Sequence, residues 1–221
     1  MNLAIIRVVA IVLFLYLTWR NLKGDYEESK LISFGWISIL FFLFFGRLAF
    51  GLLNWGVWES WQDWLMFWSK PGLSYLFGTL GFILSVFIFG KANGWKFFTF
   101  IEDNLRNFLF FLFLMLVDEL FRSRFTLKVI VFLLIIVMTY LLVLWLSKKY
   151  RSFVWYKSGK KGFVFLFSAF FVNLGIFITL LLFKEVTFLL PLSLIVSLTS
   201  LVGLFILGEV FKSVNSSKKG S

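Results

Sequence analysis

The sequence predicts an all-α integral membrane protein with about seven transmembrane helices and a tryptophan-rich helix on the outer membrane surface. Of its 221 residues, 61% are hydrophobic and only 15% are charged, a balance that a soluble domain could not present to water. Apolar runs of about 20 residues, the length needed to cross roughly 30 Å of hydrocarbon, recur along the whole chain. These two observations predict the fold class before any motif is considered.

Six apolar runs are long and uniform enough to be spanning helices. The first contains Arg7 but has no small-residue cleavage pattern after it, so we expect it to stay attached rather than to be removed as a signal peptide. A seventh span is expected at 104–121, although Arg106 and Asn107 lie at its start. The six clearer runs occupy residues 3–19, 31–53, 73–89, 126–146, 162–183 and 187–210.

The spans form one membrane domain, which we expect to cover residues 1–212. No soluble domain and no internal repeat is apparent, and the polar tail 213–221 is expected to be disordered. Small residues interrupt the last span and should allow close helix packing. They are Ser193, Ser197, Ser200 and Gly203.

The segment between the second and third spans carries tryptophan at every third or fourth position. On a helix these residues share one face, and tryptophan favours the boundary between lipid headgroups and acyl chains. The segment is therefore expected to lie flat on the outer surface, either as an anchor or as a lip that guides a lipid or a partner helix. The residues are Trp55, Trp58, Trp61, Trp64 and Trp68.

Basic residues are unevenly divided between the two sides of the membrane. With seven spans, 15 of the 22 Lys and Arg residues fall in the loops and tail on one side. Positive residues near span ends resist translocation, so this side is expected to be cytoplasmic, with the N-terminus outside and the C-terminus inside. The net charge of +11 is explained by these loops, and we expect no nucleic-acid partner.

Cysteine and histidine are both absent from the chain. This excludes a disulfide framework, a thiolate nucleophile and a Cys/His metal site, and it removes the usual proton carrier at neutral pH. We expect neither a metal ion nor a cofactor.

Two arginines lie inside apolar spans. Arg47 stands deep in the second span, where a charge costs about 2.5–3.5 kcal/mol on insertion scales, so it should face a partner or a cavity. It is a candidate for binding lipid phosphate, because a guanidinium makes two parallel hydrogen bonds to a phosphate, or for a structural pair with a carboxylate. Arg7 lies at a similar depth in the first span and is a second phosphate candidate, unless it extends to the outer interface.

Four charged residues follow one another at the outer end of the 104–121 span. Asp118, Glu119, Arg122 and Arg124 have the spacing of helical ion pairs and could neutralise each other. Alternatively, the two arginines bind lipid phosphate and one of the carboxylates takes part in chemistry.

One segment resembles a known enzyme family. Residues 68–81, WSKPGLSYLFGTLG, resemble the signature loop of the bacterial prolipoprotein diacylglyceryl transferases, with Leu76 where the family has its essential histidine. Segment 46–50, GRLAF, and segment 91–103, KANGWKFFTFIED, also resemble family motifs. The positions that hold the loop pattern, expected to act as its scaffold, include Gly72, Ser74, Gly78 and Gly81.

The resemblance implies a bacterial cytoplasmic membrane protein with a phosphatidylglycerol pocket. The family transfers a diacylglyceryl group from this lipid to a lipoprotein cysteine, so a lipoprotein signal peptide or another membrane protein is a possible partner. The family's arginine and asparagine positions fall near Val117 and Leu120, so those roles do not carry over. Without histidine, the weak candidates for a base are Tyr75, Asp118 and Glu119.

Three functions remain open from the sequence. The first is a divergent family member that keeps the lipid pocket but lacks the catalytic set. The second is an active transferase with a displaced base. The third is an unrelated transport or assembly subunit in which Arg47 pairs with a carboxylate.

Overall fold

The computed structural model describes residues 4–54, 72–153, 156, 160–184 and 187–208. The described helices fall into two compact units, Met1–Arg122 and Ser123–Ser221. The predicted tryptophan-rich helix and the predicted disordered tail both lie outside the described residues, so both stay predictions.

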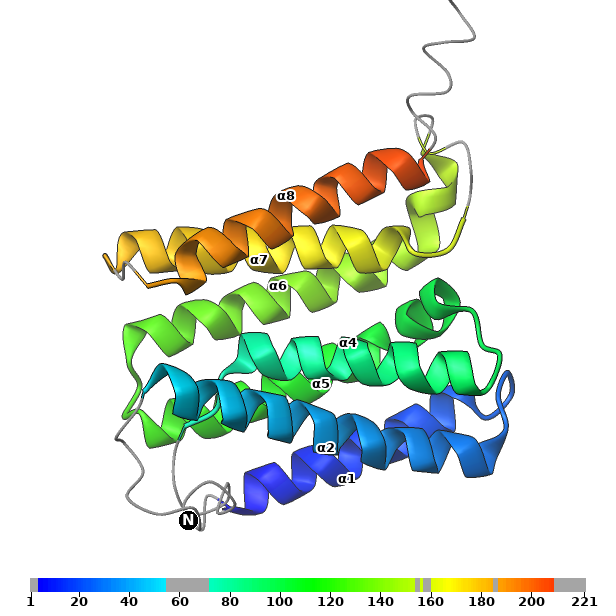
Figure 1. Ribbon diagram of the computed structural model, residues 1–221, viewed down its shortest axis with the longest axis horizontal. Helices are drawn as coiled ribbons and strands as arrows, with labels where there is room; N and C mark the ends of the chain where they lie inside the picture. The colour runs from blue at the N-terminus through cyan, green and yellow to red at the C-terminus, as the bar shows by residue number, and fades with distance from the viewer. Residues whose placement is uncertain (1–3, 55–71, 154–155, 157–159, 185–186, 209–221) are drawn as a thin grey trace, which may run out of the picture. The chain divides into compact units, whose positions relative to one another are not determined.

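The described residues of the first unit form four long helices that pack as two antiparallel pairs (Figure 1). Helix α2 packs most extensively against α4, and α1 packs against α5 and α2. The contacts between α1 and α5 show the antiparallel arrangement. Arg7, near the start of α1, contacts Asp118 near the end of α5, and Asn21, near the end of α1, contacts Asn107 in the first half of α5. The helices are α1 (Ala4–Leu22), α2 (Glu28–Leu53), α4 (Tyr75–Ala92) and α5 (Phe97–Arg122).

Phenylalanine fills the core of the first unit. Phe82 and Phe108 stack with ring centroids 3.8 Å apart, and Phe14 lies against Phe111 at 5.3 Å. Each of these side chains is at most 3% exposed. Aromatic pairs add to the free energy gained by burying their area, so this cluster holds α1, α4 and α5 together.

The described part of the second unit has three long helices and a short 3-10 turn. Helix α7 packs against both α6 and α8. The three predicted serines of α8 are buried, with Ser193 and Ser197 at 0% and 1% exposure. The Ser197 hydroxyl donates a hydrogen bond to the Phe170 carbonyl across the helix pair at 3.4 Å. The elements are α6 (Leu127–Lys149), η1 (Tyr150–Ser152), α7 (Phe163–Leu182) and α8 (Leu189–Leu207).

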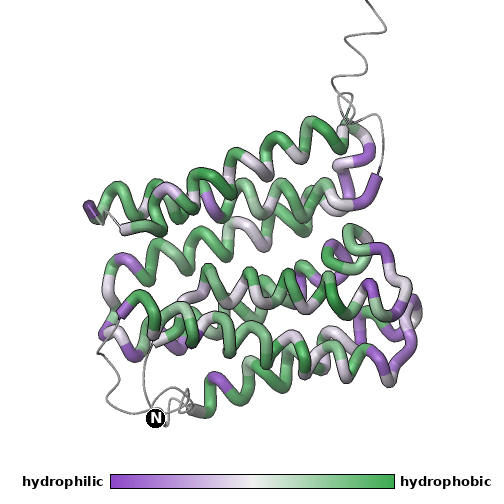
Figure 2. The backbone as a smooth tube through the Cα atoms, in the orientation of Figure 1, coloured by the Kyte–Doolittle hydropathy of each residue, from purple (hydrophilic) through white to green (hydrophobic). Residues whose placement is uncertain are grey.

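The chain is an all-α, multi-pass membrane protein, as predicted. Six of its described helices are long and apolar enough to cross a membrane, namely α1, α2, α4, α6, α7 and α8. Figure 2 shows apolar residues along the helices and polar residues gathered near their ends.

Helix α5 differs from the other six in composition. It has 26 residues, as many as α2, but acidic and basic side chains occupy both of its ends. It begins at Phe97, seven residues before the predicted start, because the polar residues there find partners in the fold. The Asp103 carboxylate accepts a hydrogen bond from the Tyr26 hydroxyl, and the Asn104 amide donates to the Phe100 carbonyl.

Candidate functional site

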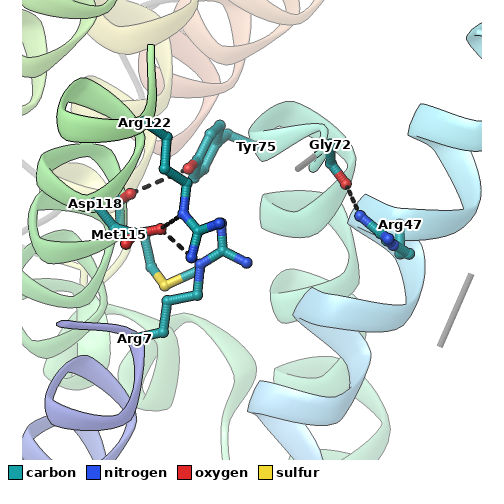
Figure 3. Close-up of polar contacts among 7 residues, drawn as sticks. All are labelled: Arg7, Arg47, Gly72, Tyr75, Met115, Asp118 and Arg122. Carbon is teal, nitrogen blue, oxygen red and sulfur yellow. Dashed lines mark hydrogen bonds and ion pairs between the residues drawn. The ribbon is translucent and has the colours of Figure 1, made fainter. Parts of the chain in front are cut away.

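Four helix ends meet at one end of the first unit. The antiparallel pairing brings together the beginnings of α1 and α4 and the ends of α2 and α5. These ends carry most of the residues singled out in the sequence, and Figure 3 shows Arg7, Arg47, Tyr75, Asp118 and Arg122 there.

A single carboxylate oxygen binds two arginines. Asp118 Oδ2 accepts hydrogen bonds from Arg7 Nε at 2.6 Å and from Arg122 Nε at 2.8 Å. The Asp118 side chain is 0% exposed, and those of Arg7 and Arg122 are 7% and 13% exposed. The expected helical pair between Asp118 and Arg122 is confirmed, and Arg7 joins it from α1.

The other carboxylate oxygen, Asp118 Oδ1, is buried without a hydrogen-bond partner among the described residues. Leaving a buried acceptor unpaired costs free energy. The ionic bonds at Oδ2 are charge-assisted and roughly twice as strong as neutral ones, so they dominate the energetics of this side chain.

The side chain of Arg47 binds a backbone group at the start of the segment before α4. Its Nη1 donates a hydrogen bond to the Gly72 carbonyl at 2.7 Å, and the residue is only 5% exposed. The Ser74 N–H donates to the Gly46 carbonyl at 2.9 Å, which fixes the segment before α4 against α2. The hydrogen bond of Arg47 to Gly72 joins α2 to this same segment.

Tyr75 connects α4 to the end of α5. Its hydroxyl donates to the Met115 carbonyl at 3.1 Å. It also interacts with the Glu119 carboxyl, which in turn feels the charges of Arg7, Asp118 and Arg122. The three base candidates of the sequence thus come together, with Leu76 next to Tyr75 in the first turn of α4.

The glycines of the family-like segment serve packing. Gly78 and Gly81 lie within α4, inside the predicted span 73–89, whereas Gly72 and Ser74 precede the helix. A Cβ at Gly81 would come within 2.5 Å of the Phe41 carbonyl oxygen, and one at Gly78 within 2.8 Å of the Phe42 ring. Only Gly72 needs the freedom of a glycine backbone, with φ at +120°.

Arg124 belongs to the second unit and lies in the connection before α6. It is exposed and has a φ of +52°.

Sequence reasoning missed a second polar group between α1 and α5, toward their other ends. The Asn21 amide donates to the Asn107 carbonyl oxygen at 2.7 Å. Thr18 Oγ1, Asn104 Oδ1 and Asn107 Nδ2 are buried without a hydrogen-bond partner among the described residues. The only hint of this group in the sequence is the presence of two asparagines in the first half of α5.

The arrangement suits the binding of an anion better than acid–base chemistry. Three guanidinium groups, which stay charged at any physiological pH, are fixed at one end of a single unit. Asp118 is committed to two of them. Among the described residues, no group of three or more acidic side chains is placed to hold a metal ion.

Comparison of the chain with protein-family models, with curated proteins and with solved structures gives no match.

Proposed function

We propose that this protein binds the phosphate headgroup of an anionic phospholipid, with phosphatidylglycerol as the preferred ligand. In this proposal it is a divergent relative of the prolipoprotein diacylglyceryl transferases that keeps a lipid pocket and lacks the catalytic set. A lipoprotein signal peptide or another membrane protein is then its expected partner.

The single observation that carries the proposal is the gathering of three arginines, Arg7, Arg47 and Arg122, at one end of the first unit (Figure 3). Arg47 is 5% exposed, and the side chains of Arg7 and Arg122 are 7% and 13% exposed. Charged groups among apolar helices are costly to bury, so three of them at one helix end favour an anionic ligand there. A lipid phosphate accepts two parallel hydrogen bonds from a guanidinium.

The distribution of basic residues supports an outward-facing site. If the N-terminus is outside, the beginning of α1 and the end of α5 face the outer leaflet. The family resemblance favours the bacterial cytoplasmic membrane, whose anionic lipids include phosphatidylglycerol.

The proposal is tested by equilibrium binding in nanodiscs. Wild-type protein, in discs of phosphatidylcholine, is titrated with fluorescent phosphatidylglycerol or fluorescent phosphatidylcholine. We expect tighter binding of phosphatidylglycerol, and about a tenfold weaker affinity in Arg47→Gln, because the charge-assisted contact is lost. Equal binding of the two lipids by folded wild-type protein would contradict the proposal.

A control separates charge from packing at this position. Arg47→Lys keeps the positive charge but loses the planar donor geometry. It should recover part of the affinity that Arg47→Gln loses. Identical affinities in wild type and both variants would assign Arg47 a purely structural role.

A second candidate is an active transferase with a displaced base. It is favoured by the meeting of Tyr75, Asp118 and Glu119 at the arginine-rich end of the unit. Of the three, Glu119 fits a base better than Asp118, which binds two arginines. Incubation with radiolabelled phosphatidylglycerol and a lipobox peptide distinguishes the candidates: we expect no label on the peptide, and robust transfer that Glu119→Gln abolishes would establish the enzyme instead.

A further inference from the structure

We infer that Asp118 is a positioning residue, which holds Arg7 and Arg122 together as one phosphate-binding pair. This inference rests on the proposed lipid-binding function and assigns Asp118 a role in it different from that of a base. Arg7 and Arg122 are called the arginine pair below.

The geometry of the arginine pair is set by one atom. Both hydrogen bonds come from Nε and both end on Asp118 Oδ2, at 2.6 and 2.8 Å. The two arginines come from different helices and are far apart in sequence, and this shared acceptor brings their Nε atoms together. A guanidinium donates in several directions at once, through Nε and through both terminal nitrogens.

The two guanidinium groups need a negative charge between them. Like charges at this distance repel, and both side chains are almost fully removed from water. The carboxylate offsets this repulsion, so the arginine pair and Asp118 together carry a net charge of one positive unit. A singly charged phosphodiester has the opposite charge.

Holding the arginine pair in place favours binding. An arginine side chain loses rotamer entropy when it binds a ligand. Asp118 removes much of that freedom before the ligand arrives, which is the general advantage of preorganisation. Arg47 is prepared in the same way by the Gly72 carbonyl.

The same helix provides a matched control. Asp103 lies near the other end of α5, where its carboxylate accepts a hydrogen bond from the Tyr26 hydroxyl. Asp118→Asn and Asp103→Asn make the same chemical change on one helix. Asp118→Asn removes the charge to which the arginine pair is bonded.

The test measures phosphatidylglycerol binding in phosphatidylcholine nanodiscs for wild type and these variants. We expect Asp118→Asn to weaken binding about tenfold, and Asp103→Asn to leave it unchanged. The double variant Asp118→Asn/Arg122→Gln should bind no more weakly than Asp118→Asn, because the arginine pair is already separated. A folded Asp118→Asn protein that binds like wild type would overturn the inference.

Two further arms keep the outcomes distinct. If Asp118→Asn does not fold, Arg7→Gln, Arg122→Gln and their double variant take its place. Losses of affinity that are not additive support a pair acting as a unit, and additive losses contradict it.

Inorganic phosphate is titrated in parallel, and tighter binding of phosphate than of the lipid would overturn the lipid assignment. Wild type without any preference for phosphatidylglycerol would defeat the proposed function, whereas a preference that Asp118→Asn retains defeats this inference alone.

Discussion

Two buried arginines of the first unit have described bonds to two kinds of acceptor. Arg7 donates to a carboxylate on another helix, and Arg47 donates to a backbone carbonyl. The depth of both arginines was evident from the sequence. Their partners were not, because Asp118 lies more than 100 residues from Arg7 and Gly72 offers only its backbone.

The ion pairs of Asp118 with Arg7 and Arg122 yield a prediction about the free energy of unfolding. Replacing Asp118 with Ala leaves two buried guanidinium groups without their shared counterion and should cost roughly 3–5 kcal/mol. Arg7→Met should cost less, because Asp118 keeps its bond to Arg122. Thermal unfolding in detergent, followed by tryptophan fluorescence, gives the order. A larger loss for Arg7→Met than for Asp118→Ala would contradict the shared-acceptor arrangement.

Tyr26 gives a pH dependence outside the spanning segments. Burial raises the pKa of Tyr26 above its ordinary value of 10.0, and the negative charge of Asp103, which accepts its hydrogen bond at 3.0 Å, raises it further. The folded state therefore favours the neutral phenol. The resulting stability is fully present below about pH 10, where the unfolded phenol is also neutral, and is lost as the pH rises above that value.

The measurement compares the unfolding temperatures of wild type and Tyr26→Phe between pH 8 and about pH 11. The difference between the two proteins should be constant up to about pH 10 and should then fall. Because the variant retains every lysine, their titration cancels in the comparison. A difference that grows with pH would show that the folded state favours the phenolate.

At the scale of elements, the close approach of α2 and α4 explains the glycines of the family-like segment. The sequence indicated which glycines hold the family pattern but not what each position requires of its residue. The predicted span 73–89 contains Gly78 and Gly81, and the structure shows that both lie where α4 packs against α2. The spans themselves were predictable, since hydropathy is sufficient to locate helices of this length.

The helix contact predicts a sharp contrast between two glycines of α4. Gly81→Ala would place a methyl group within 2.5 Å of the Phe41 carbonyl oxygen, so α2 and α4 must move apart, at a cost of about 1–3 kcal/mol. Gly90→Ala meets its nearest atom, the Trp95 carbonyl oxygen, at an ordinary 3.4 Å and should be neutral or slightly stabilising. Equal unfolding temperatures for the two variants would contradict the described packing.

At the scale of the whole molecule, composition predicted the membrane and the all-α fold, and it limited the chemistry. A chain without histidine or cysteine has few groups suited to proton transfer at neutral pH. What composition could not supply was the convergence of Arg7, Arg47, Tyr75 and Asp118, because antiparallel pairing of helices is a tertiary property. That convergence turns scattered charges into a candidate anion site.

The most direct test of that site is to find where a bound phosphatidylglycerol lies. A phosphatidylglycerol with a photoreactive group on its headgroup is crosslinked to the protein in nanodiscs, and the modified residues are mapped by mass spectrometry. We predict adducts at the beginnings of α1 and α4 and the ends of α2 and α5, near Arg47 and Tyr75, with little labelling by the matching phosphatidylcholine. Adducts of both lipids at similar yield, without enrichment near those helix ends, would contradict the account.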